Sequence, residues 1–138
     1  MQRIDPAAWL GTVQAEAARG FTEFVTLIGL DDGGLQLWLR LSDLEGQHTV
    51  LAANAEDGID SLVTIFPQCA WYEREAAEMF GISFHGHDTA LLLLGTVAAQ
   101  PPMRKDAHLD ARQVPWPGEK EPGGAMARRR QRPPGVPA

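Results

Sequence analysis

The alternation of leucine with other residues over positions 35–41 constrains the fold of this 138-residue chain most strongly. Leucine occupies positions 35, 37, 39 and 41, and Gln36, Trp38 and Arg40 stand between them. Successive side chains of a β-strand point to opposite faces, so all the leucines share one face. The segment therefore predicts a strand with one face buried against a core.

A second strand precedes it. Residues 21–30 are rich in β-branched and aromatic side chains, and the Asp-Asp-Gly-Gly sequence at 31–34 is typical of a tight turn. We expect an antiparallel hairpin with one face on the core. Strict alternation places Phe24 and Ile28 on the face opposite Leu27.

The N-terminal residues predict an amphipathic helix over residues 6–19. Asp5 is a suitable cap, Pro6 is a favourable first residue, and Gly20 ends the helix. Apolar residues recur at helical spacing on one side. The side chains that we expect this helix to bury are Trp9, Leu10 and Val13.

Three more elements follow the hairpin. A short strand is predicted at 48–52, and a short apolar helix at 61–66, which Pro67 stops. A longer helix is predicted over 70–80, because its Ala, Glu, Met and Arg residues are good helix formers, no β-branched residue intervenes, and Gly81 supplies the stop. Together the elements predict an α+β fold, a small antiparallel sheet packed with helices in a single domain.

Proline and glycine crowd the chain from about residue 110 onward. We therefore expect a domain over residues 1–109 and an extended or disordered interaction tail over 110–138. Trp116 stands between two prolines in this tail, and an isolated tryptophan in such a place is typical of a docking side chain.

Charge and composition exclude several classes of protein. The net charge is −6 although four arginines lie at 128–132, so the remaining chain is strongly acidic, which argues against nucleic acid as a partner. The single cysteine excludes an internal disulfide and suits a reducing cytoplasm. No apolar run reaches the roughly eighteen residues of a spanning helix, so we expect only peripheral contact with a membrane.

The predicted helix at 70–80 carries most of the charged residues that could serve chemistry. Glu75 and Glu78 share a face, Glu73 points elsewhere, and Arg74 precedes Glu78 by four residues, where it can neutralise that carboxylate. Carboxylates can act as general acids or bases, but without further partners they favour a charged contact face that forms ion pairs. We expect this helix to be a contact surface.

A metal site or a nucleophile is a weaker possibility. His85, His87 and Cys69 are too few for a structural zinc site, and we expect His87 to hydrogen-bond to backbone after the turn at Gly86. Cys69 has no visible activating base, which favours a small buried side chain. The sequence contains no glycine-rich phosphate loop or dinucleotide fingerprint, so we expect the chain to bind neither NADH nor flavin.

The run Trp-Tyr-Glu-Arg-Glu-Ala-Ala-Glu-Met-Phe-Gly-Ile at 71–82, followed by Phe84, Gly86 and His87, resembles a known family signature. It is similar to E-R-E-x-x-D-x-F/Y-G-I-x-F-x-G-H-P of the C subunit of NADH-quinone oxidoreductase, also called the thirty-kilodalton subunit of complex I. Residues 102–106 are similar to the P-L-R-K-D motif of the same family.

The match has departures. Glu78 replaces the usual Asp, Asp88 stands where the family has Pro, and residues 90–93 replace a more basic segment. These differences concern the partner surface rather than the fold.

The resemblance implies a small α+β domain in the peripheral arm of the complex, on the cytoplasmic face of the cell membrane, with no redox centre of its own. It implies a scaffold between the quinone-site large subunit and a cluster-bearing small subunit. NAD, FMN, iron–sulfur clusters and quinone would belong to the assembled complex, and contact with the membrane would occur only through that complex.

The hypothesis that follows is a non-catalytic scaffold subunit. An alternative is the equivalent subunit of a related membrane-bound nickel-iron hydrogenase or ferredoxin-linked complex, and a third is an independent small enzyme using the glutamates or His85 and His87. The residues expected at the partner interface are Glu73, Arg74, Glu75, Glu78, His87, Arg104, Lys105, Asp106 and Trp116.

Overall fold

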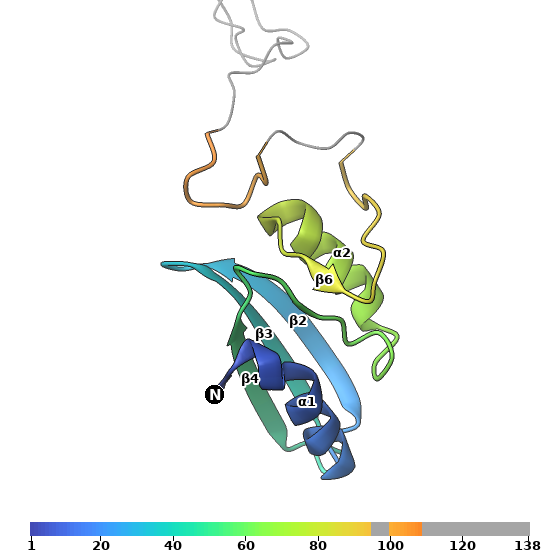
Figure 1. The fold of residues 1–138 in the computed structure, drawn as a ribbon. Helices are drawn as coiled ribbons and strands as arrows, with labels where there is room; N and C mark the ends of the chain where they lie inside the picture. Colours follow the sequence, from blue (N-terminus) through green and yellow to red (C-terminus); the bar gives the residue numbers. More distant parts are fainter. Residues whose placement is uncertain (95–99, 109–138) are drawn as a thin grey trace, which may run out of the picture. The chain divides into compact units, whose positions relative to one another are not determined.

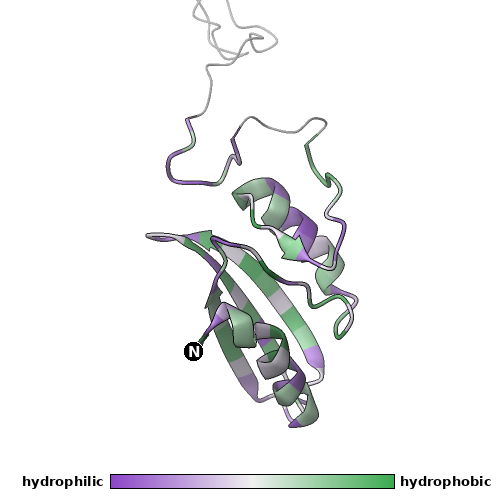
Figure 2. Ribbon diagram, viewed as in Figure 1, coloured by the Kyte–Doolittle hydropathy of each residue, from purple (hydrophilic) through white to green (hydrophobic). Residues whose placement is uncertain are grey.

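The computed structural model describes residues 1–94 and 100–108, which are organised around a mixed sheet (Figure 1). The strand order is β1-β4-β3-β2; β2, β3 and β4 are antiparallel, and β1 joins β4 in parallel. The alternation of polarity along these strands is visible in Figure 2. The strands are β1 (Gln2–Ile4), β2 (Glu23–Asp31), β3 (Leu35–Ser42) and β4 (His48–Asn54).

Two α-helices and a small parallel strand pair complete the fold, and the predicted α+β class is confirmed. Among the described residues, neither helix has the length and apolar character needed to cross a membrane. The elements are the 3-10 helix η1 (Pro6–Ala8), the helices α1 (Trp9–Ala18) and α2 (Cys69–Phe80), and the strands β5 (Ile59–Asp60) and β6 (Phe84–His85).

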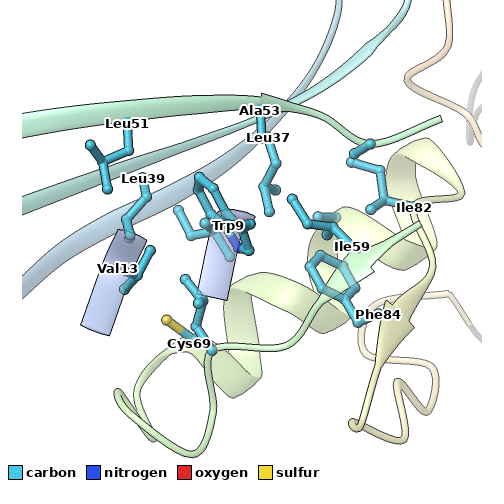
Figure 3. Packing of buried hydrophobic residues seen from close by; sticks show 14 of the residues in the cluster. Trp9, Val13, Leu37, Leu39, Leu51, Ala53, Ile59, Cys69, Ile82 and Phe84 are labelled. Atoms are coloured by element: carbon cyan, nitrogen blue, oxygen red, sulfur yellow. The ribbon is translucent and has the colours of Figure 1, made fainter. Parts of the chain in front are cut away.

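The leucine face of β3 forms the centre of the core, as its alternation predicts. All of its leucines are buried, and side chains from both helices pack against the same face (Figure 3). The expected burial of Trp9 and Val13 is confirmed, whereas Leu10 is half-buried beside the core. The Asp5 carboxylate accepts a hydrogen bond from the Ala7 N–H at 2.9 Å, which is the predicted cap.

Two short elements differ from prediction. The three-residue strand β1 was not predicted because it is too short to show alternation, and it depends on pairing with β4. The predicted helix at 61–66 is wrong, since this segment forms only a single turn, in which the Phe66 N–H donates to the Leu62 carbonyl at 2.8 Å. Six residues before a proline are too few to sustain a helix.

A β-bulge in β2 inverts part of the predicted alternation. The register with β3 shifts between Phe24 and Thr26, which leaves Val25 without an opposite residue. The ring of Phe24 therefore turns to the core face, with its centroid 5.1 Å from that of Tyr72. The prediction that Phe24 lies on the face of Ile28 is wrong, because one inserted residue reverses the alternation beyond it.

Helix α2 approaches β2 closely at Gly29. A Cβ atom at this position would lie only 2.8 Å from Cδ2 of Phe80. Since Phe24 meets Tyr72 near the beginning of both elements and Gly29 meets Phe80 near their ends, α2 and β2 run side by side in the same direction.

We predict that Gly29→Ala lowers the free energy of unfolding by about 1–3 kcal/mol, because the added methyl group overlaps the Phe80 ring. Gly11→Ala is the matched control: a Cβ there meets nothing within 4 Å, and alanine in a helix stabilises by up to about 1 kcal/mol. Urea unfolding of both variants measures the difference. Equal stability of the two variants would contradict the close approach.

Candidate functional site

The carboxylate of Glu73 is fully buried and accepts three hydrogen bonds from separate parts of the chain. Oε2 accepts from the Ser61 hydroxyl at 2.8 Å and lies 2.9 Å from Nδ1 of His87. Oε1 accepts from the Leu62 N–H at 2.7 Å. A buried carboxylate is tolerated only with such compensation, so these contacts are structurally necessary.

Local structure brings these partners together. Strands β5 and β6 pair in parallel, with Ile59 opposite Phe84, so the residues that follow each strand emerge at the same end. Gly86 then has a φ angle of +89°, a left-handed conformation that glycine adopts without strain and that turns His87 toward Glu73. Ser61 and Leu62 follow β5 directly.

This geometry corrects two predictions. Glu73 does not lie on an exposed contact face, because helical spacing shows which residues share a side but not which side is buried. His87 bonds to the Glu73 carboxylate rather than to backbone. Sequence reasoning also missed Ser61, which stands twelve residues before Glu73 with no pattern that connects them.

The Ser61, Glu73 and His87 side chains do not form a nucleophilic triad. In such a triad the histidine lies between the hydroxyl and the carboxylate and accepts the hydroxyl proton. Here the carboxylate is central, and the hydroxyl donates to Glu73. The arrangement holds segments together and leaves the hydroxyl unactivated, which does not favour the hypothesis of an independent enzyme.

Arg74 and Glu78 bind the segment after His87 from one side of α2. The Arg74 guanidinium donates to the carbonyl oxygens of Ala90 at 2.8 Å and Leu91 at 2.6 Å. The Glu78 carboxylate accepts from the successive N–H groups of residues 92–94. Arg74 therefore binds the carbonyl groups of this backbone stretch, and Glu78 binds its N–H groups. The two side chains form no direct ion pair with each other.

The pKa of Glu78 reflects its contacts with Arg74 and with the N–H groups of residues 92–94, which together we call the Glu78 cradle. Desolvation is the largest single influence and raises the pKa, but the N–H groups of Leu93, Leu94 and Leu92, together with the Arg74 charge, outweigh it and hold the pKa below its ordinary value of 4.5. The cradle therefore favours the ionised carboxylate.

Glu75 is the one acidic residue of α2 that faces solvent and takes part in none of the hydrogen bonds or ion pairs of the described residues. Trp71, one turn earlier, is 62% exposed, and the Arg74 guanidinium lies 5.3 Å from the centroid of its ring. Glu75 remains a predicted contact for a partner, and Trp71, which is not among the predicted contacts, is exposed one turn away from it.

The motif at 102–106 binds back onto the hairpin. The Lys105 N–H donates to Asp31 at 2.9 Å, and its ammonium group donates to Asp32 at 2.8 Å. The hydrogen bond and charge of Lys105 lower the pKa of Asp32, and the hydrogen bond with Asp32 raises the pKa of Lys105. Arg104 lies 3.9 Å from Asp31 and 3.6 Å from Asp106.

The remaining candidates are dispersed. His85 lies 3.4 Å from Asp60, apart from the His87 contact with Glu73, and the described residues contain no group of three or more potential metal ligands. Cys69 is buried as expected, and burial, with a smaller effect of Glu73, raises the pKa of its thiol to about 12. Trp116 and the predicted tail lie outside the described residues.

We predict that Glu73→Gln lowers the free energy of unfolding by about 3 kcal/mol, because one amide oxygen cannot serve three donors and the amide group faces another donor. The control Glu75→Gln, at an exposed position, should change it by less than about 0.5 kcal/mol. Chemical denaturation measures both. Small, equal losses would show that the buried carboxylate is not a structural anchor.

We predict that the Glu78 cradle weakens in acid. The folded pKa lies below the ordinary value of 4.5, so its stabilisation is present above that value and is lost as the pH falls through the folded pKa. The protection factor of the Leu93 amide, which is the exchange rate of an unstructured amide at the same pH divided by that of Leu93, should therefore fall in this range. Glu78→Gln should lower this protection factor already at neutral pH, and a protection factor that stays constant as the pH falls in the natural chain would contradict the cradle.

Comparison with known proteins agrees with the resemblance. The family model described as respiratory-chain NADH dehydrogenase, 30 Kd subunit, matches residues 2–113. The NADH-quinone oxidoreductase C subunit of Rhodobacter capsulatus is 37% identical over 99 residues, which cover 66% of this chain and 50% of the relative. The corresponding protein of Dechloromonas aromatica is 32% identical over 120 residues, which cover 72% of this chain and 60% of the relative. The chain thus spans 50% and 60% of the length of these two curated relatives.

Solved structures show the same fold. The structure of the membrane-bound sulfane sulfur reductase, an archaeal respiratory membrane complex, contains a chain that matches with a TM-score of 0.70 and 16% identity, covering 87% of this chain and 84% of that one. A trypsin-resistant fragment of Nqo5 matches with a TM-score of 0.58 and 17% identity, and the match covers 62% of this chain and 78% of the fragment. The family match over most of the sequence, on this fold, shows that the chain belongs to the family of the 30 Kd subunit of respiratory-chain NADH dehydrogenase.

Proposed function

We propose that this chain is a non-catalytic scaffold subunit in the peripheral arm of an NADH-quinone oxidoreductase, which transfers electrons from NADH to quinone and couples this transfer to ion translocation. Membership of the family supports this proposal. The observation that carries it is the internal use of the charged side chains of the signature, in which Glu73, Arg74 and Glu78 all bind other segments of the same chain.

The scaffold role follows from what these bonds do. They fix the turn after β5 and residues 90–94 against α2, so that this helix and its surroundings form a rigid surface. A rigid surface loses little conformational entropy when a partner binds, which is what a subunit that positions others requires. Trp71 and Glu75 are the exposed side chains of α2 and are accessible to such a partner.

The partners that we propose are the quinone-site large subunit and a cluster-bearing small subunit. NAD, FMN, iron–sulfur clusters and quinone would then be bound by other chains of the complex. The chain would lie at the cytoplasmic face of the membrane and touch the membrane only through this assembly. Arg104, Lys105 and Asp106 remain proposed contacts, presented by a loop that the hairpin holds in place.

We predict that a tagged chain recovers subunits of an NADH-quinone oxidoreductase in a pull-down followed by mass spectrometry. A large subunit with ligands for a nickel-iron centre would instead indicate the related hydrogenase. Recovery of no respiratory or hydrogenase subunits would contradict both the NADH-quinone oxidoreductase proposal and the hydrogenase alternative. In the same assay, Arg74→Ala should lower the assembled fraction at least tenfold, because two hydrogen bonds from a charged donor are lost and a loss of about 1.4 kcal/mol already corresponds to tenfold.

The matched control is Arg74→Lys, which keeps the charge but cannot present the two donors of the guanidinium fork to both carbonyl oxygens, so assembly should fall by an intermediate amount. An Arg74→Ala chain that assembles fully but yields a complex without electron transfer would indicate a chemical role and contradict the scaffold proposal.

A further inference from the structure

The edge of β2 is unpaired in the part of the chain that the structure describes. β2 is the last strand in the order β1-β4-β3-β2. In an antiparallel ladder, residues alternate between bonding to one neighbour and to the other. The Ala55 N–H donates to the Leu35 carbonyl, and the Asp43 N–H donates to the Gln47 carbonyl, so the odd-numbered residues of β3 bond toward β4.

The even-numbered residues of β3 therefore bond toward β2, where their partners are Thr26, Ile28 and Leu30. Between them, Leu27 and Gly29 direct their backbone N–H and C=O groups away from β3, toward the free edge. These groups are the template that an added strand uses.

A groove of about 380 Å³ runs along this edge. Its floor is residues 26–30 of β2, and its wall is one face of α2. Five strand residues span about 13 Å, and the helix face from Tyr72 to Phe80 spans about 12 Å. The groove thus matches four or five residues of extended chain. The other lining residues are Tyr72, Glu75, Ala76 and Phe80 of α2, together with Met103.

The chemistry around the groove is apolar with one free carboxylate. Ile28 is 47% exposed and Met103 is 58% exposed. Glu75 lies in the wall, and it also lines the neighbouring hollow of about 700 Å³ beside Trp71. An occupant that offers apolar side chains and one basic side chain complements this surface.

The sequence of β2 gives a separate reason to expect a cover. Residues 24–30 are apolar or β-branched apart from Gly29, with no charge and no proline. A long, uncharged edge strand tends to pair with strands of other chains, and proteins normally cover such an edge or place charged side chains along it. The bulge at Val25 protects only the beginning of β2.

We propose that the groove between β2 and α2 binds an extended segment of a partner subunit, which adds to β2 as a strand and places a lysine or arginine beside Glu75. This proposal rests on the proposed function in requiring a complex that contains this chain. A second copy of the chain fits less well, because the net charge of −6 and a second Glu75 would bring like charges together.

Site-specific photocrosslinking in the native complex tests this. A photoreactive amino acid at position 28 should crosslink to a segment of another subunit with alternating apolar residues and a lysine or arginine. The control is the same label at position 44, which is 86% exposed in the β3–β4 loop and should not crosslink to that segment. A crosslink at position 28 to a second copy or to residues of the same chain beyond 108 would overturn the proposal.

A charge reversal provides the second arm. Glu75→Arg should lower the crosslink yield at position 28 about tenfold, whereas Asp57→Arg, an exposed acid with no hydrogen bond or ion pair in the described residues, should leave it unchanged. If the complex assembles but position 28 crosslinks to nothing, this proposal fails and the scaffold function stands. If the chain recovers no subunits, both fail.

Discussion

The buried carboxylate of Glu73 is the interaction on which the rest of the described structure depends. It joins helix α2 to the turn after β5 through Ser61 and Leu62, and to the chain after β6 through His87. Burying a charge is costly, and three donors offset that cost only when all of them are in place. The contact therefore fixes three segments in one geometry, and a partial version of it is unfavourable.

Around this anchor, the signature acquires a structural explanation. Arg74 and Glu78 hold one backbone segment by its carbonyl and N–H groups, Gly81 ends α2 in the left-handed conformation with a φ angle of +76°, and Gly86 turns His87 back toward the helix. What looks in the sequence like a group of reactive side chains is a set of internal bonds. The outward surface of α2 is left to Trp71 and Glu75, which suits a subunit that positions others.

The sequence predicted elements better than it predicted partners. The leucine alternation in β3 and the Asp5 cap of η1, which leads into α1, depend on neighbouring residues, so local patterns were sufficient for the α+β fold. The position of Phe24 depends on a bulge, and the bonds of Glu73 depend on the pairing of β5 with β6, both of which involve residues distant in the sequence. Helical periodicity separated Glu73 from Glu75 but gave no sign of which of the two is buried.

Amide hydrogen exchange at Leu62 measures the anchor most directly, because this N–H donates to Glu73 in an otherwise irregular segment. We expect it to be among the slowest-exchanging amides outside the helices and strands, and to exchange much faster in Glu73→Gln while amides of the β3–β4 ladder remain protected. Exchange at Leu62 as fast as in the exposed loop around Leu44, in the natural chain, would contradict the central role of the buried carboxylate.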